Sequence, residues 1–156
     1  MRDYADVVVK PPLLFGGAAI LGCLLSWLVP FGPGLGSANG RALATGATFA
    51  LLGLALGIAS IAALRRAGTT ERIEEGETKA MVESGPYRFT RNPIYIGLIL
   101  LYFGLAIMLT SEWMLVLLVP ALMILQRGVV EREEAYLSEK FGEAYRKYQT
   151  RVPRWL

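Results

Sequence analysis

The chain has 156 residues, enough for one domain, a net charge of +3, 54% apolar residues and a positive mean hydropathy. The charges are bunched, and a soluble fold would leave too few polar residues to cover its surface. The sequence has no histidine and one cysteine, Cys23, which excludes histidine-bound metals, Ser-His-Asp catalysis and any intrachain disulfide. We expect neither a metal site nor a nucleic-acid partner.

Uncharged stretches predict about four transmembrane helices in an all-α integral membrane fold. The first two hold 17 and 23 residues, near the roughly 20 that span about 30 Å of hydrocarbon. Glu112 alone separates the last two, so we expect a helical hairpin there. A cleaved signal peptide is the alternative for the first stretch, although its apolar run exceeds a usual signal core. The predicted spans are residues 13–29, 42–64, 93–110 and 113–127.

Basic residues in the connections predict the orientation. Six lie in the loop 65–92 and seven between residues 127 and 154, and Lys10 precedes the first span. The first outer loop has only Arg41, and the hairpin tip has none. We therefore expect one membrane domain over residues 1–156, multi-pass in the inner (cytoplasmic) cell membrane, with the loop 65–92 and both termini cytoplasmic.

Small residues line one side of the second predicted span. Gly53 and Gly57 have the spacing that lets membrane helices approach closely, and Gly46, Ala50 and Ser60 fall along much of the same side. We predict that this face packs inside the helix bundle. A homodimer through the same face is the alternative.

The segment after the last span has an amphipathic pattern. Leu137, Phe141, Tyr145 and Tyr148 are spaced by three and four residues, and charged residues occupy the other faces. We predict one amphipathic helix over about residues 130–149, lying on the cytoplasmic membrane surface or folded back over the bundle.

No predicted span contains Asp, Glu, Lys or Arg, except for Arg127 at the last position of the fourth, which argues against a proton-coupled exporter. Polar chemistry gathers instead where the third span begins. Gly85-Pro86 predicts a turn, and Pro93 suits the first turn of a helix, whose amino end attracts anions. This segment reads as a pocket for an anionic and aromatic ligand, or alternatively as a positively charged anchor with interfacial tyrosines. Its polar residues are Tyr87, Arg88, Arg91, Asn92 and Tyr95.

A second charged cluster follows the fourth span. Arg127 is followed by Glu131, Arg132, Glu133 and Glu134. Both ends of a helical hairpin emerge on the same side of the membrane, so at least one of these carboxylates could face the Tyr87–Tyr95 segment. Such a carboxylate can hold a ligand's ammonium group or ribose hydroxyls. The alternative is a solvated charged surface.

These residues carry a family resemblance. The run Gly85-Pro-Tyr-Arg-Phe-Thr-Arg-Asn-Pro-Ile-Tyr-Ile-Gly97 resembles the G-x-Y-x-x-x-R-H-P-x-Y-x-G motif of the isoprenylcysteine carboxyl methyltransferases and related phospholipid methyltransferases. The tail, with Glu133-Glu-Ala-Tyr-Leu, Phe141-Gly-Glu-Ala-Tyr-Arg-Lys-Tyr and Arg151-Val-Pro153, resembles the closing segment of the same family.

The resemblance implies an integral membrane methyltransferase that takes S-adenosyl-L-methionine from the cytoplasm and a lipophilic acceptor, isoprenylcysteine carboxylate-like or lipid, from the bilayer. It implies catalytic roles for Arg127 and Glu133. The implied cofactor contacts are Lys79, Ala80, Met81, Val82, Tyr87, Arg91, Asn92, Pro93, Ile94, Tyr95 and Glu133.

Two positions depart from the family pattern. Asn92 replaces the usual histidine of the motif, and Val129 aligns with the arginine assigned to the acceptor carboxylate in the prenylcysteine enzymes. Two other functions stay open. One is a membrane reductase of the sterol-reductase type that uses NADPH, and the other is a non-catalytic four-helix membrane subunit.

Overall fold

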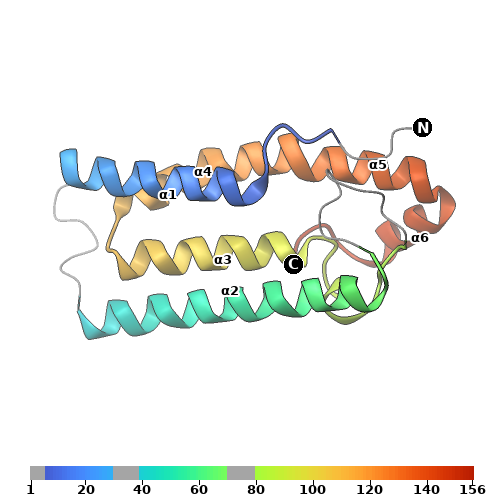
Figure 1. The fold of residues 1–156 in the computed structure, drawn as a ribbon, viewed down its shortest axis with the longest axis horizontal. Coiled ribbons are helices and arrows are strands. Elements are labelled where there is room, and N and C mark those ends of the chain that lie inside the picture. Colours follow the sequence, from blue (N-terminus) through green and yellow to red (C-terminus); the bar gives the residue numbers. More distant parts are fainter. Residues whose placement is uncertain (1–5, 30–38, 70–79) are drawn as a thin grey trace.

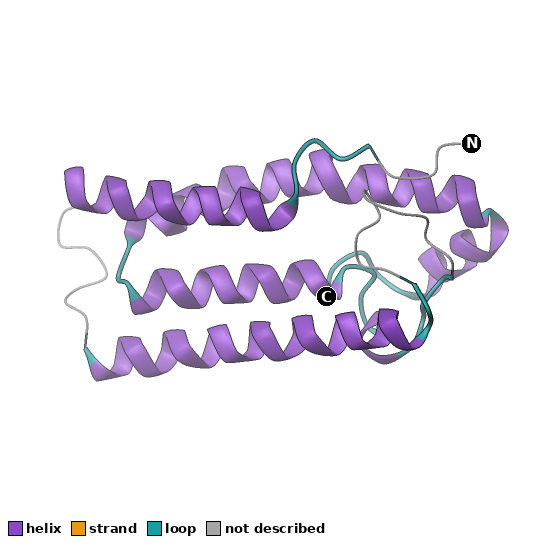
Figure 2. Ribbon diagram, viewed as in Figure 1, coloured by secondary structure: helices purple, strands orange, loops and turns teal. Residues whose placement is uncertain are grey.

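The computed structural model describes residues 6–29, 39–69 and 80–156. Four long helices run side by side, and two further helices sit at one end of the bundle (Figures 1 and 2). All regular structure in these residues is helical, so the predicted all-α class is confirmed. The elements are α1 (Pro11–Leu28), α2 (Gly40–Arg66), the 3-10 helix η1 (Gly85–Arg88), α3 (Pro93–Met108), α4 (Glu112–Leu125), the π-helix η2 (Gln126–Val130), α5 (Glu131–Phe141) and α6 (Glu143–Arg151).

Among the described residues, three helical segments are long and apolar enough to cross a membrane: α1, α2 and the continuous helix Glu112–Phe141. The apolar helix α3 is shorter, at 16 residues. The outer faces of these helices expose many large apolar side chains. Soluble proteins rarely expose apolar patches of this extent to water. The chain is an integral membrane protein, as its sequence predicts. The exposed residues include Leu13, Ile20, Leu24, Trp27, Leu51, Leu54, Ile58 and Val119.

The helix α3 and the continuous helix Glu112–Phe141 are paired but differ in length, so their far ends do not lie at the same level. At about 1.5 Å per residue, α3 is roughly 24 Å long and Glu112–Phe141 is roughly 45 Å. Both leave the same short turn, and the hydrocarbon is about 30 Å thick. The longer helix therefore continues past the start of α3 as α5.

Glycines allow α2 and α3 to pack backbone against backbone. A Cβ atom added to Gly53 would meet the backbone of Gly97 and Leu101, and one added to Gly104 would meet Gly46 and Ala50. This contact confirms that the small-residue face of α2 packs inside the bundle at Gly46, Ala50 and Gly53, whereas a Cβ atom added to Gly57 would meet nothing within 4 Å. The homodimer through the same face stays a prediction.

The other side of the bundle joins α1 to α4. Phe15, Tyr102 and Met114 are buried together there, and the Tyr102 hydroxyl donates to the Met114 carbonyl oxygen at 2.9 Å. Near the hairpin tip the hydroxyls of Ser26 and Ser111 lie 2.7 Å apart. The hairpin α3–α4 is thus held between α1 and α2, which sets the position of the ends where α3 begins and α4 continues into η2.

The carboxyl-terminal region differs from the single helix predicted over residues 130–149. The helix α4 does not end but passes through the π-helix η2 directly into α5. The second difference is a break at Gly142, whose φ of +54° strongly favours glycine. After this corner α6 turns back toward the bundle (Figure 1). Periodicity alone did not reveal the break because glycine inside a helix costs only about 1 kcal/mol.

We expect Gly53→Val to destabilise the fold, because the added side chain would separate α2 from α3. Overpacking of this kind costs about 1–3 kcal/mol. Gly17→Val is the matched control, since a Cβ atom at Gly17 meets nothing within 4 Å. Unfolding by sodium dodecyl sulfate in mixed micelles measures the difference. Equal stability of the two variants would contradict the close α2–α3 contact.

Candidate functional site

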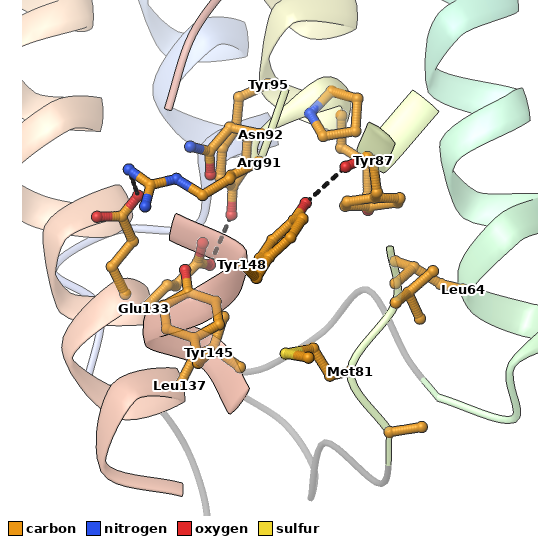
Figure 3. A pocket seen from close by; sticks show the side chains of 15 residues that line it. Leu64, Met81, Tyr87, Arg91, Asn92, Tyr95, Glu133, Leu137, Tyr145 and Tyr148 are labelled. Carbon is orange, nitrogen blue, oxygen red and sulfur yellow. Dashed lines mark hydrogen bonds and ion pairs between the residues drawn. The ribbon is translucent and has the colours of Figure 1, made fainter. Parts of the chain in front are cut away.

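A cavity with a mainly apolar lining and a few polar side chains lies at the end of the bundle where α2 ends and α3 begins, with α5 and α6 closing the far side (Figure 3). Every implied cofactor residue in the described part of the chain lines it, whereas Lys79 lies outside the described residues. The lining consists of Leu64, Ala80, Met81, Val82, Tyr87, Arg91, Asn92, Pro93, Ile94, Tyr95, Glu133, Glu134, Leu137, Tyr145 and Tyr148. Segments distant in sequence therefore share one cavity, while their roles remain predictions.

The cavity is small in this structure, about 100 Å³. Ligand pockets commonly measure roughly 300–1,000 Å³. A nucleoside-sized ligand must therefore widen the cavity. The wall contributed by α6 is a suitable part to move, since α6 joins α5 through a single glycine, Gly142.

A hydrogen bond between Tyr95 and Glu133 joins the two predicted clusters. The Tyr95 hydroxyl donates to Glu133 Oε1 at 2.6 Å, and Glu133 is only 5% exposed. Tyr95 lies in the first turn of α3 and Glu133 in the first turn of α5. A carboxylate after the fourth span does face the Tyr87–Tyr95 segment, as the hairpin geometry predicted. Burying a carboxylate is costly unless it is paired, and this bond provides part of that pairing.

The neighbouring carboxylate, Glu134, binds two arginines. Arg154 donates to it from Nε at 3.1 Å and from Nη2 at 2.7 Å, and Arg91 Nη2 lies 3.1 Å from Glu134 Oε1. The bidentate bond to Glu134 raises the pKa of the Arg154 guanidinium, which remains charged. The Arg91 Nε is buried and has no acceptor among the described residues. This cavity-lining side chain therefore keeps one donor for a ligand.

The end of the chain crosses the start of α3. The carbonyl oxygen of Arg154 accepts from Thr90 Oγ1 at 2.9 Å and from Asn92 Nδ2 at 3.1 Å, and the Pro153 carbonyl oxygen accepts from the Arg91 amide at 3.0 Å. Asn92, the residue in place of the family histidine, thus binds the tail. An amide does so without changing charge with pH.

Tyrosine rings form much of the cavity wall. The Tyr148 hydroxyl donates to the Tyr87 carbonyl oxygen at 2.7 Å, which fastens α6 to η1 (Figure 3). Burial, followed by the charge of Glu83, raises the pKa of Tyr148 to about 12. Burial, followed by the charge of Glu134, also raises the pKa of Tyr145. Both phenols stay neutral at physiological pH, and their rings offer an aromatic surface to a ligand.

The structure does not bring Arg127 to this cavity. Arg127 is exposed and lines a separate hollow with Gln126 and Trp155, so its catalytic role stays a prediction. Val129 is fully buried in the apolar core. The position that the family resemblance aligns with an arginine is therefore an apolar core position here.

The sequence interpretation missed several residues of the cavity. Glu134 appeared only as one member of a charged run, and Tyr145 and Tyr148 only as an apolar stripe. The spacing of these tyrosines was the available signal for the cavity wall. Tyrosines three residues apart on an otherwise charged helix lie on one face, and that face is expected to pack against an apolar partner. The pattern could not identify the partner as η1 and the start of α3.

We expect Glu134→Ala to lower the free energy of unfolding by about 3 kcal/mol, because it leaves Arg91 buried without a carboxylate. Glu131→Ala is the matched control in the same helical turn. Glu131 is half exposed and lies 3.9 Å from Arg154, so its loss should cost under about 1 kcal/mol. Detergent-micelle unfolding curves test this, and equal losses would contradict the buried ion cluster.

The pKa of Tyr148 predicts a loss of stability at alkaline pH. In the unfolded chain the phenol ionises near pH 10, whereas in the folded protein it stays protonated up to about pH 12. The stabilisation is complete below pH 10 and is lost as the pH rises through 12. Unfolding midpoints across this range should fall more steeply for the parent than for Tyr148→Phe. Parallel curves would show that Tyr148 ionises normally.

Comparisons with known proteins agree with this arrangement. The family model described as phospholipid methyltransferase matches residues 42–144. A Haemophilus influenzae protein of uncharacterized function is 30% identical over 63 residues, 40% of this chain and all of that protein. The protein-S-isoprenylcysteine O-methyltransferases of mouse and rat are each 34% identical over 80 residues, 51% of this chain but only 28% of theirs. No solved structure matches. The family match covers well over half of the sequence, and the chain belongs to the phospholipid methyltransferase family.

Proposed function

We propose that this protein is an S-adenosyl-L-methionine-dependent methyltransferase that modifies a lipophilic acceptor taken from the bilayer. The observation that carries the proposal is the cavity around Tyr95 and Glu133. It collects the implied cofactor residues at the depth where α3 meets the membrane surface. A water-soluble cofactor can reach that depth from one side and a membrane-dissolved acceptor from the other.

The residues of the cavity fit the parts of the cofactor. The rings of Tyr87 and Tyr148 suit an adenine. The buried carboxylate of Glu133 suits an ammonium group or ribose hydroxyls. The buried Nε of Arg91 suits a carboxylate, as does the amide of Ile94, which has no acceptor among the described residues at the amino end of α3.

S-adenosyl-L-methionine, when bound, supplies an electrophilic methyl group whose carbon–sulfur bond breaks as the acceptor's lone pair attacks, leaving a thioether. The protein's task is to align the reactants and exclude water. Tyr95 holds the Glu133 carboxylate in one orientation, and Tyr148 keeps α6 against η1 as a cover. A carboxylate acceptor is nucleophilic as it stands, whereas an amine or thiol must first lose a proton.

The acceptor class follows from the membrane location. The mouse and rat relatives carry names that specify protein-S-isoprenylcysteine, but this chain spans about a quarter of their length. With Val129 buried and Asn92 bound to the tail, an isoprenylcysteine carboxylate-like compound and another membrane lipid are both candidates. Basic residues near the cavity support a cytoplasmic position for it and for both termini, in the inner membrane.

Calorimetry with S-adenosylhomocysteine tests the cofactor site. We expect the parent protein in nanodiscs to bind it in the micromolar range. Tyr95→Ala and Glu133→Ala should each weaken binding about tenfold, equivalent to about 1.4 kcal/mol. Glu139→Ala is the control, because Glu139 is exposed on α5 and does not line the cavity. Absence of binding to the parent, in nanodiscs and in detergent, would overturn the proposal.

Incubation with methyl-labelled S-adenosyl-L-methionine and total membrane lipid tests the reaction. We expect label in a lipid-extractable product, and its loss in Glu133→Ala. NADPH is titrated in parallel. NADPH binding with no methyl transfer would instead support a reductase, and binding of neither compound would support a non-catalytic subunit.

A further inference from the structure

A second hollow, here called the groove, opens between the cytoplasmic half of α2, the start of α1 and the start of α3. Its volume is about 680 Å³, within the range of roughly 300–1,000 Å³ for ligand sites. Exposed side chains at its edge, Leu13, Leu54 and Ile58, show that it opens outward on the lipid-facing side of the bundle. The groove is therefore accessible from the bilayer.

The groove is apolar along most of its length and polar at one end. Among the described residues, Lys10 and Tyr95 are the polar side chains that line it. Both belong to the end of the bundle where α1 and α3 begin. On α2 the groove runs from Gly53 to Ile61, roughly 12 Å at about 1.5 Å per residue. That length is most of one leaflet of a hydrocarbon core about 30 Å thick.

The polar end of the groove meets the candidate cofactor cavity. Ile94 and Tyr95 line both hollows, and the Tyr95 hydroxyl donates to Glu133 within the cavity. A molecule whose hydrocarbon lies in the groove would therefore place its polar head beside Tyr95.

Gly57 keeps the groove open. A Cβ atom at Gly57 would meet nothing within 4 Å, whereas one at Gly53 would meet the α3 backbone. The two glycines of the α2 motif thus differ. Gly53 permits helix packing, and the missing side chain of Gly57 leaves space that belongs to the groove. Helix packing alone does not require glycine at position 57.

We infer that the groove binds one hydrocarbon chain of an inner-leaflet amphiphile, the methyl acceptor, and that Gly57 determines how bulky that chain can be. The identification of this amphiphile as the methyl acceptor rests on the proposed function. Lys10, at the polar end, complements a negatively charged head group. The size, apolar lining and lipid-facing opening of the groove all match a single chain, and its polar end places the head group where the cofactor cavity begins.

Photolabelling in nanodiscs tests the groove independently of activity. The probe is a single-chain carboxylic amphiphile with a diazirine midway along its chain, and peptide mass spectrometry maps the label. We expect label concentrated on the lining segments of α2 and α3. Gly57→Phe should reduce that label at least fivefold without changing label on the outer face of α1. Gly16→Phe is the matched control, because a Cβ atom at Gly16 also meets nothing within 4 Å but lies outside the groove.

Label spread evenly over all lipid-facing helices, or groove label unchanged in Gly57→Phe, would overturn the inference. Binding of S-adenosylhomocysteine is measured on the same variants and should be within twofold of the parent in Gly57→Phe. If no variant, the parent included, binds the nucleoside while the groove is labelled as expected, the cofactor proposal fails and the hydrocarbon site stands. If the nucleoside binds and the groove is not labelled, the hydrocarbon-site inference fails and the cofactor proposal stands.

Discussion

The arrangement of the site depends on one buried carboxylate, Glu134, shared by Arg91 and Arg154. Arg91 precedes α3 and Arg154 lies in the tail after α6, so this carboxylate on α5 fixes the start of α3, the tail and α5 relative to one another. Glu133 immediately precedes Glu134, and its direction toward Tyr95 follows once α5 is fixed. The side chains of Arg91 and Glu134 are only 10% and 8% exposed, and such charges are costly to bury unless they are paired, which makes the arrangement specific.

The bilayer supplies the second constraint. The helix α3 is shorter than the hydrocarbon is thick, while the helix that returns from the hairpin is longer. This inequality carries α5 and its carboxylates past the amino end of α3. The cavity and the groove share Ile94 and Tyr95 at that depth. A soluble ligand and a membrane-dissolved ligand can therefore approach the same two residues.

Much of this could be predicted from sequence, because the relevant signals are local. Uncharged stretches identified the helices, and the motif from Gly85 to Gly97 identified one side of the cavity. Hairpin geometry alone could not choose between Glu133 and Glu134, since neighbouring helical residues point about 100° apart and the π-helix η2 shifts the phase before them. The family resemblance selected Glu133, the residue that contacts Tyr95. The break between α5 and α6 at Gly142 could not be predicted from the sequence either. It depends on the tertiary contact by which Tyr148 docks on Tyr87.

The central claim is that a nucleoside cofactor and a lipid-borne acceptor meet at Tyr95 and Glu133. The most direct measurement is an experimental structure of the protein in lipid nanodiscs with S-adenosylhomocysteine bound. The account predicts the nucleoside between the tyrosines of η1 and α6, with its sulfur facing the polar end of the groove at Tyr95. A nucleoside bound elsewhere, or one separated from the groove by closed protein, would contradict it.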